Sequence, residues 1–194
     1  MESYIEELRN SNEKEAEFII TVSGPSGSGK STLAQYLAEK LEFEHISAGK
    51  IFRSIASERD ETVEELSHNA DKETDLEVDQ RVLKKSLKKS CVVDSRIAPW
   101  VLGRYSDFNF YLTAEEEERA RRVAERKDIT EEEALKRNRK RDRDNRSRYS
   151  EYYGISPADH SIFDAEIDTT DQTPEEQNKQ GETILRKRFP QLFE

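Results

Sequence analysis

Short apolar runs alternate with longer polar segments along this chain of 194 residues. Each run is rich in β-branched and aromatic residues, a composition that favours strands. The runs predict strands at Phe18–Ser23, Phe43–Ser47, Cys91–Asp94, Phe108–Leu112 and Ala165–Asp168. The segments between them repeat apolar residues at helical spacing, as Leu33, Leu37 and Leu41 do after the first run.

Four T-x-x-E sequences have the form of a capping box and mark expected helix starts. They lie at Thr62–Glu65, Thr113–Glu116, Thr130–Glu133 and Thr173–Glu176, and Pro174 strengthens the last of them. The alternation of strands and helices predicts an α/β protein with a five-stranded parallel sheet and helices on both faces. In such a sheet, ligands bind at the carboxyl ends of the strands.

The segment "SGPSGSGKST", residues 23–32, joins the first predicted strand to the first predicted helix. It fits the pattern G-x-x-x-x-G-K-[ST] in the strand–loop–helix context that a phosphate-binding loop requires. A plain Gly/Ser turn is the alternative, but the flanking elements favour the phosphate loop and hence the P-loop NTPase fold. The residues that this motif assigns to ATP are Gly24, Pro25, Ser26, Gly27, Ser28, Gly29, Lys30, Ser31 and Thr32. Backbone N–H groups of such a loop hold phosphates, while the Lys and Ser serve phosphate and Mg²⁺.

Composition narrows the class of protein further. The net charge of −10 argues against a general nucleic-acid binder, and no apolar run approaches the length of a membrane span, about 18 residues. Residues 1–16 form a polar leader without the apolar core of a signal peptide, and we expect residues 17–194 to form a single domain. The single cysteine, Cys91, is expected to be a small buried residue in a reducing compartment, which favours the cytoplasm.

Residues 136–148, "KRNRKRDRDNRSR", concentrate positive charge. This segment has a charge of +6, which leaves −16 for the remainder of the chain. Such a block can be a focused anion site, an RNA-binding arm or a solvated helix face, and charge alone favours the solvated face. The arginines Arg119 and Arg122 precede it, and we expect them to pair with neighbouring glutamates on a solvated helix.

The D-x-x-G and N-K-x-D motifs of a signalling GTPase are missing from the sequence, and the chain is short for a motor ATPase. A small kinase with a lid over its substrate remains. Three further segments support it: "HISAGKIFR" at 45–53, "CVVDSRIAPW" at 91–100 and "RDRDNRSRYSEYYGI" at 141–155. Together with the phosphate loop they resemble the P-loop nucleoside monophosphate kinases, most closely the short archaeal-type cytidylate kinases. The resemblance extends from about Phe18 to Phe189.

The resemblance implies ATP as phosphoryl donor, CMP and dCMP as acceptors, and Mg²⁺. It implies an acceptor-binding segment at about 49–90, with Ser47, Gly49, Arg53 and Arg96 at the acceptor site, and a lid at about 126–153. Mg²⁺ would be held by Ser31 and Asp94, directly or through water. The predicted catalytic residues are Lys30, Arg126, Arg141 and Arg148. The chain departs from the family where Asp94-Ser95-Arg96 replaces Glu-Gly-Arg and where Asn145 replaces an acidic residue.

Physical chemistry agrees with these roles. A phosphate acceptor is already ionised at neutral pH, so the reaction needs fixed cations rather than a general base. Arg141 and Arg148 are seven residues apart and share a helix face. We expect Tyr149, Tyr152 and Tyr153 to pack the lid against the core, and Gly154 to end the helix.

We expect a monomer that binds neither nucleic acid nor a membrane. Two alternatives stay open. The first is a kinase of the same fold that acts on AMP, UMP or a non-nucleotide acceptor, and the second is an RNA-associated ATP-binding protein that uses residues 136–148 as its arm.

Overall fold

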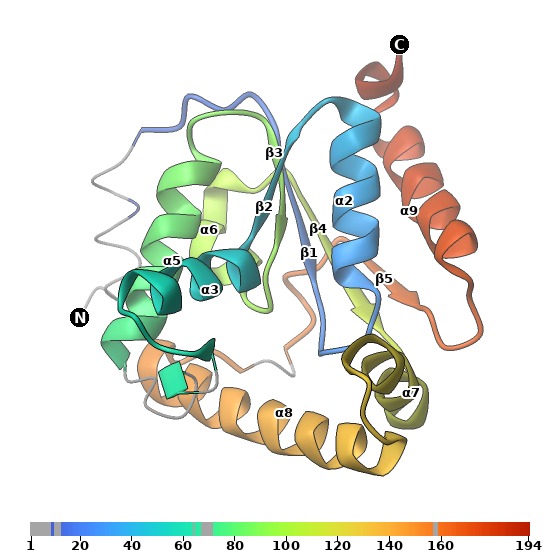
Figure 1. Ribbon diagram of the computed structural model, residues 1–194. Coiled ribbons are helices and arrows are strands. Elements are labelled where there is room, and N and C mark those ends of the chain that lie inside the picture. The colour runs from blue at the N-terminus through green and yellow to red at the C-terminus, as the bar shows by residue number, and fades with distance from the viewer. Residues whose placement is uncertain (1–8, 10–12, 64, 67–71, 157–158) are drawn as a thin grey trace.

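The computed structural model describes residues 9, 13–63, 65–66, 72–156 and 159–194. Its centre is a parallel sheet in the order β2-β3-β1-β4-β5 (Figure 1). The strands are β1 (Ile19–Ser23), β2 (Glu44–Ser47), β3 (Cys91–Asp94), β4 (Phe108–Thr113) and β5 (Ala165–Asp168). Each lies within one residue of its predicted bounds, and the predicted five-stranded parallel sheet is confirmed.

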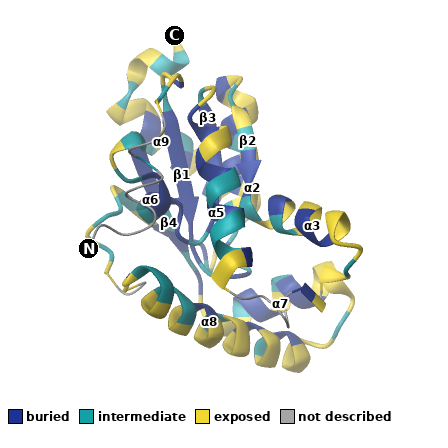
Figure 2. Ribbon diagram, turned by 90° about the vertical axis from the view of Figure 1, so that its left-hand side faces the viewer, coloured by how far each residue is buried: buried dark blue, intermediate teal, exposed yellow. Residues whose placement is uncertain are grey.

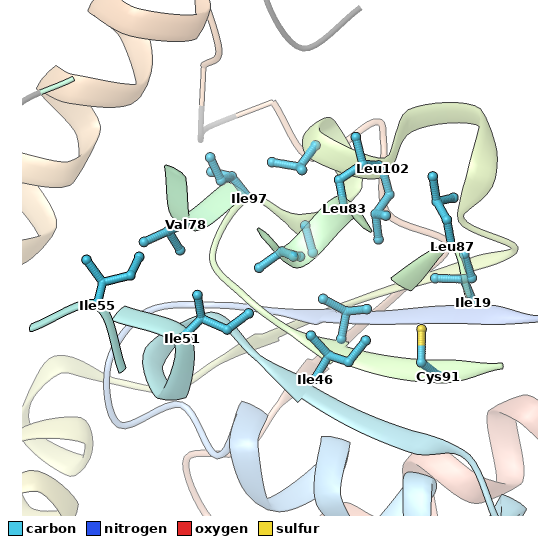
Figure 3. Close-up of a cluster of buried hydrophobic side chains, with 14 of the residues drawn as sticks. Ile19, Ile46, Ile51, Ile55, Val78, Leu83, Leu87, Cys91, Ile97 and Leu102 are labelled. Atoms are coloured by element: carbon cyan, nitrogen blue, oxygen red, sulfur yellow. The ribbon is translucent and has the colours of Figure 1, made fainter. Parts of the chain in front are cut away.

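Helices cover both faces of the sheet and bury a separate apolar cluster on each. On one face, α2 (Lys30–Leu41) and α9 (Pro174–Arg188) pack over β1 and β4. On the other face lie α5 (Lys72–Ser86) and α6 (Ala98–Leu102), with α3 (Ala48–Glu58) beside them. Figure 3 shows this second cluster, in which Ile19 and Cys91 from the sheet meet Leu83 and Leu102 from the helices. The prediction that Cys91 is buried is confirmed.

A hairpin of two charged helices, α7 (Glu116–Lys127) and α8 (Glu131–Tyr153), extends past the carboxyl ends of the strands (Figure 1). The two helices share a small apolar cluster of Ala120, Val123, Ala124 and Ala134. Their outer faces are exposed, whereas the central strands β1 and β3 are buried (Figure 2). Short 3₁₀ turns, η1 (Gly103–Tyr105) and η2 (Pro190–Phe193), complete the described elements.

The capping predictions have mixed outcomes. Thr130 caps α8, and Thr173 with Glu176 forms a complete reciprocal box at α9. Thr62 and Glu65 also exchange both bonds, although part of the segment that follows them is outside the described residues. The prediction for Thr113 is wrong: this residue is the last of β4, where it pairs with Asp168, and α7 starts only at Glu116. The pairing of Thr113 with β5 therefore prevails over the local sequence pattern that predicted a helix cap.

The segment just before β1 is attached to the body of the protein. The N–H groups of Glu15 and Ala16 both donate to the carbonyl of Leu87, and Lys14 forms an ion pair of 2.8 Å with Asp107. Ala16 belongs to the core cluster around α5. Among the described residues, the model contains no helix with the length and apolar character to cross a membrane.

Candidate nucleotide site

The phosphate loop leaves β1 at Gly24 and ends where α2 begins at Lys30. Gly29 caps the helix in a left-handed conformation (φ 85°) and has no side chain to bond the first N–H groups of α2. At Gly24 a Cβ atom would lie 2.2 Å from the carbonyl oxygen of Leu112, so only glycine allows this close approach to β4. The result is a helix N-terminus whose N–H groups are available to an anion.

Strand register brings three polar side chains together beside this loop. Asp94, the last residue of β3, is level with Ser47 in β2 and with Val22 in β1. The hydroxyl of Ser31 donates to Asp94 Oδ2 at 2.6 Å, and the hydroxyl of Ser47 donates to the same oxygen at 3.3 Å. Asp94 is buried. Oxygen donors of this kind, next to a phosphate site, fit Mg²⁺, which commonly takes one or two carboxylates and completes its shell with water and phosphate.

Three arginines lie close enough to Lys30 to affect its charge. Burial of the Lys30 ammonium group lowers its pKa to about 8; Asp94 acts in the opposite direction, and Arg96, Arg141 and Arg126 lower it further. The pKa of Arg141 is also lowered, by loss of water around its guanidinium group and by Arg96. Cations that depress each other's pKa are stabilised when an anion binds among them. The arrangement therefore fits a polyphosphate.

Two predicted residues lie apart from this group. Arg148 forms an ion pair with Asp75 of α5 (3.2 Å) and donates to Asn145 Oδ1 (2.7 Å). Arg53 is exposed on α3, one turn after Gly49. Within the described part of the chain, no hydrogen bond or ion pair joins either arginine to Lys30 or Asp94. Each arginine is on an element that borders the site, so a change in side-chain or lid position would be needed to bring it to a phosphate.

Sequence reasoning missed the role of Arg119 and Arg122. The prediction that Arg119 lies on a solvated helix face is wrong, because it is only 6% exposed and donates to the carbonyl of Ser26 in the phosphate loop (3.2 Å). Arg122 does bond Glu118, as predicted, but it also donates to the carbonyls of Gly27 (3.3 Å) and Thr169 (2.5 Å). The sequence carries one signal for these contacts with the phosphate loop. Both arginines lie in the first turns of a helix that follows the carboxyl end of a strand, at the edge of the sheet where the loop also lies.

A cavity of about 340 Å³ lies beside the phosphate loop, between β4, α6 and α8. Its lining combines Gly24 and Pro25 with Arg96, Arg119 and Asp142. His160 also lines it and packs against Tyr111, with ring centres 4.4 Å apart and the ring planes tilted by 47°. The cavity therefore continues the charged site toward the inner face of α8.

The end of α8 is fixed to helix α5. Tyr149 and Tyr153 pack against the core cluster, and Gly154 ends the helix at φ 64°, as predicted. The hydroxyl of Tyr153 donates to Asp79 at 2.5 Å. Burial raises the pKa of Asp79 to about 7, although this hydrogen bond opposes the rise. With the Arg148–Asp75 ion pair, these contacts join α8 directly to α5.

This combination of a parallel sheet, a glycine loop and a helix N-terminus surrounded by cations defines the class of P-loop kinases. Solved structures share the fold. A shikimate kinase from Acinetobacter baumannii has a TM-score of 0.57 at 17% identity, covering 92% of this chain and 96% of that one. A gluconokinase from Sinorhizobium meliloti has a TM-score of 0.59 at 14% identity, covering 91% and 95%. Identities this low establish the fold alone.

Sequence comparison then defines the family. Residues 19–171 match the cytidylate kinase-like family. Curated relatives include the cytidylate kinases of Halobacterium salinarum, 40% identical over 81% of this chain and 83% of that protein, and of Pyrococcus furiosus, 42% identical over 81% and 82%. The chain belongs to the cytidylate kinase-like family, which confirms the resemblance drawn from its motifs.

The buried Asp79 predicts an unusual dependence of stability on pH. Its pKa is about 7 in the folded protein and about 4 in an unfolded chain, so between these values only the folded state keeps the proton. The contribution of Asp79 to stability is therefore greatest below pH 4 and is lost as pH rises to 7. Asp79→Asn removes this titration while keeping an acceptor for Tyr153. Relative to wild type, the variant should gain about 2 kcal/mol of unfolding free energy between pH 5 and pH 8.

Urea denaturation of both proteins at the two pH values measures this difference. Glu73→Gln, an exposed change on the same helix, is the matched control and should shift little. An equal effect of Asp79→Asn at pH 5 and pH 8 would show that Asp79 is ionised throughout.

Proposed function

We propose that this protein is a cytidylate kinase, which transfers the γ-phosphoryl group of ATP to CMP and dCMP and releases ADP with CDP or dCDP. The observation that carries the proposal is the Ser31–Asp94 hydrogen bond of 2.6 Å at the N-terminus of α2, beside Lys30. Arg96, Arg126 and Arg141 are close enough to lower the pKa of Lys30. The names of the curated relatives supply the acceptor. In the reaction, a phosphate oxygen of CMP forms the new bond to the γ-phosphorus, and the bond from that phosphorus to the β–γ bridging oxygen breaks.

On the donor side, the loop Gly24–Thr32 would hold the ATP phosphates through its N–H groups, with Lys30 on the transferred group. Mg²⁺, when bound, would neutralise charge on the β- and γ-phosphates. Ser31 and Asp94 would hold it, directly or through water. The carbonyls of Ser26 and Gly27 are already bonded by Arg119 and Arg122, so the loop is braced from the side of α7. A braced loop loses less freedom when ATP binds.

On the acceptor side, Arg53 and Arg96 would bind the CMP phosphate, and Ser47 and Gly49 would line the site. This assigns about residues 49–90 to the acceptor-binding segment. Because the CMP phosphate is ionised at neutral pH, no residue has to remove a proton before it attacks. The task of the protein is to bring two anions together, and planar arginine forks suit that task better than lysines do.

The lid, about residues 126–153, would close over both nucleotides and bring Arg141 and Arg148 to the transferred phosphoryl group. Closure would also exclude water, which otherwise competes as acceptor. Arg148 would have to exchange Asp75 for phosphate, so the observed ion pair gives the lid a defined resting contact. A soluble monomer acting in the cytoplasm completes the proposal.

An acceptor panel tests the substrate. With ATP and Mg²⁺, we expect CMP and dCMP to give the highest kcat/KM among CMP, dCMP, UMP, AMP, shikimate and gluconate, measured as ADP release in a coupled assay. The last two acceptors are included because kinases of the same fold are named for them. Faster transfer to any other acceptor would refute the proposed substrate, and salt-sensitive RNA binding without transfer would support an RNA-associated protein.

Lys30→Ala tests the donor site. Loss of the ammonium group from the transferred phosphoryl should lower kcat by at least about a hundredfold while the protein stays folded, as judged by circular dichroism. Lys40→Ala is the matched control, because Lys40 is exposed at the far end of the same helix. Normal turnover by folded Lys30→Ala would contradict the assignment of this loop.

Arg148→Ala tests the lid. If this arginine meets the phosphoryl group only after closure, its loss should lower kcat by a factor of about 10³ and change the KM for ATP much less. Arg143→Ala serves as control, since Arg143 is exposed on α8 and lies 3.9 Å from its neighbour Asp144. Unchanged kcat in Arg148→Ala would show that its ion pair with Asp75 is purely structural.

A further inference from the structure

Asp142, on the inner side of α8, bridges two arginines from different parts of the fold. Its Oδ1 accepts a hydrogen bond from Arg96 Nη1 at 2.9 Å, and its Oδ2 accepts one from Arg119 Nη1 at 2.9 Å. Arg96 follows β3 on the acceptor side, whereas Arg119 belongs to α7. One carboxylate of the lid thus connects the acceptor arginine with the hairpin next to the phosphate loop.

Arg119 is a fixed anchor for this bridge. It is buried, and in addition to Asp142 it bonds the carbonyls of Ser26 and Ala114, each at 3.2 Å. Its backbone also lies against the loop, because a Cβ atom on Gly27 would come within 2.5 Å of the Arg119 carbonyl oxygen. A guanidinium group held at three points can transmit its position to the carboxylate that it binds.

Arg96, by contrast, is held at one nitrogen and available at another. Nη1 bonds Asp142, while Nη2 is buried and has no hydrogen-bond partner within the described ranges. An unpartnered guanidinium nitrogen in a buried position is costly unless a ligand completes its bonding. The same arginine is close enough to Lys30 and Arg141 to lower the pKa of both. Its free nitrogen therefore belongs to the phosphate site.

The positive charges of Arg96 and Arg119 also favour a carboxylate at position 142. Without Asp142, the guanidinium groups of Arg96 and Arg119 would lose the carboxylate that they share. With Asp142, the two arginines and the carboxylate keep a single net positive charge, enough to attract an anion. The carboxylate therefore holds the acceptor arginine in place without cancelling its attraction for phosphate.

We propose that Asp142 is a positioning residue that orients Arg96 for the acceptor phosphate and ties the lid helix to the donor loop through Arg119. The inference rests on the proposed kinase activity and adds a residue to it. Because Asp142 directly follows Arg141, the same bridge also sets the place where Arg141 enters the site. A displacement of about 1 Å in such groups can cost about a hundredfold in rate.

Asp142→Asn tests the inference, since the amide keeps the size of the side chain but accepts only one strong hydrogen bond. We expect the KM for CMP to rise about tenfold and kcat to fall about tenfold, with the KM for ATP within about twofold of wild type. Asp142→Glu, which restores a carboxylate, should recover part of both losses. The matched control is Asp144→Asn, an exposed position on the same helix, which should behave as wild type.

A double-mutant cycle separates positioning from simple stabilisation. Arg96→Lys removes the planar guanidinium group that Asp142 would orient. In this background, adding Asp142→Asn should therefore raise the KM for CMP less than twofold further. A purely structural role would instead lower the melting temperature and leave the KM for CMP unchanged. Additive effects in the cycle, or a normal KM for CMP in Asp142→Asn, would overturn the proposal. If the asparagine variant does not fold, Asp142→Ser, which also lacks the carboxylate, takes its place in both measurements.

Failure of the proposed function gives a different result. If wild type transfers phosphate to another acceptor of the panel and not to CMP, the substrate assignment fails. The same cycle is then measured with that acceptor, and a raised acceptor KM in Asp142→Asn upholds the positioning role while an unchanged KM refutes it. If wild type transfers phosphate to no acceptor, both proposals fail together.

Discussion

The pairing of β3 with both β1 and β2 in parallel register is the constraint on which the rest of the site depends. It places Asp94 level with Ser47 of β2 on one side and with Val22 of β1 on the other. Because β1 leads directly into the glycine loop, the same register brings Ser31 to within 2.6 Å of Asp94. A shift of one residue in β3 would turn the carboxylate to the opposite face of the sheet and separate these groups.

Around this fixed point, the protein gathers more positive charge than its own carboxylates neutralise. The pKa of Lys30 is lowered although Asp94 favours its charged form, because burial and three arginines outweigh one carboxylate. Such a cluster is unfavourable in the empty protein and becomes favourable when phosphates enter it. The overall net charge of −10 does not predict this local excess, because a net charge does not say where on the protein the charges lie.

The lid hairpin is joined to the body at both ends by different kinds of contact. Near the phosphate loop, the buried Arg119 and the partly buried Arg122 of α7 bond carbonyls of that loop. Near α5, the contacts are the Arg148–Asp75 ion pair and the Tyr153–Asp79 hydrogen bond, which join α8 to α5. These contacts join the hairpin to the phosphate loop and to α5, while exposed arginines of residues 136–148, Arg137, Arg139 and Arg143, lie next to neighbouring carboxylates.

The sequence by itself determined the strands, their order along the chain, the phosphate loop and the family. These features are encoded in contiguous residues: apolar runs, glycines at fixed spacing and motifs such as "SAGKIFR". It did not determine the partner of a long charged side chain. Arg119 has glutamates within one helical turn, yet it is buried against Ser26 and Asp142, which are 93 and 23 residues away. Arg148, whose predicted place is at the phosphates, forms an ion pair with Asp75 of α5 in this structure, which the sequence did not indicate. Arginine side chains reach several possible partners with small differences in free energy, and only the packing of α7 and α8 against the sheet selects among them.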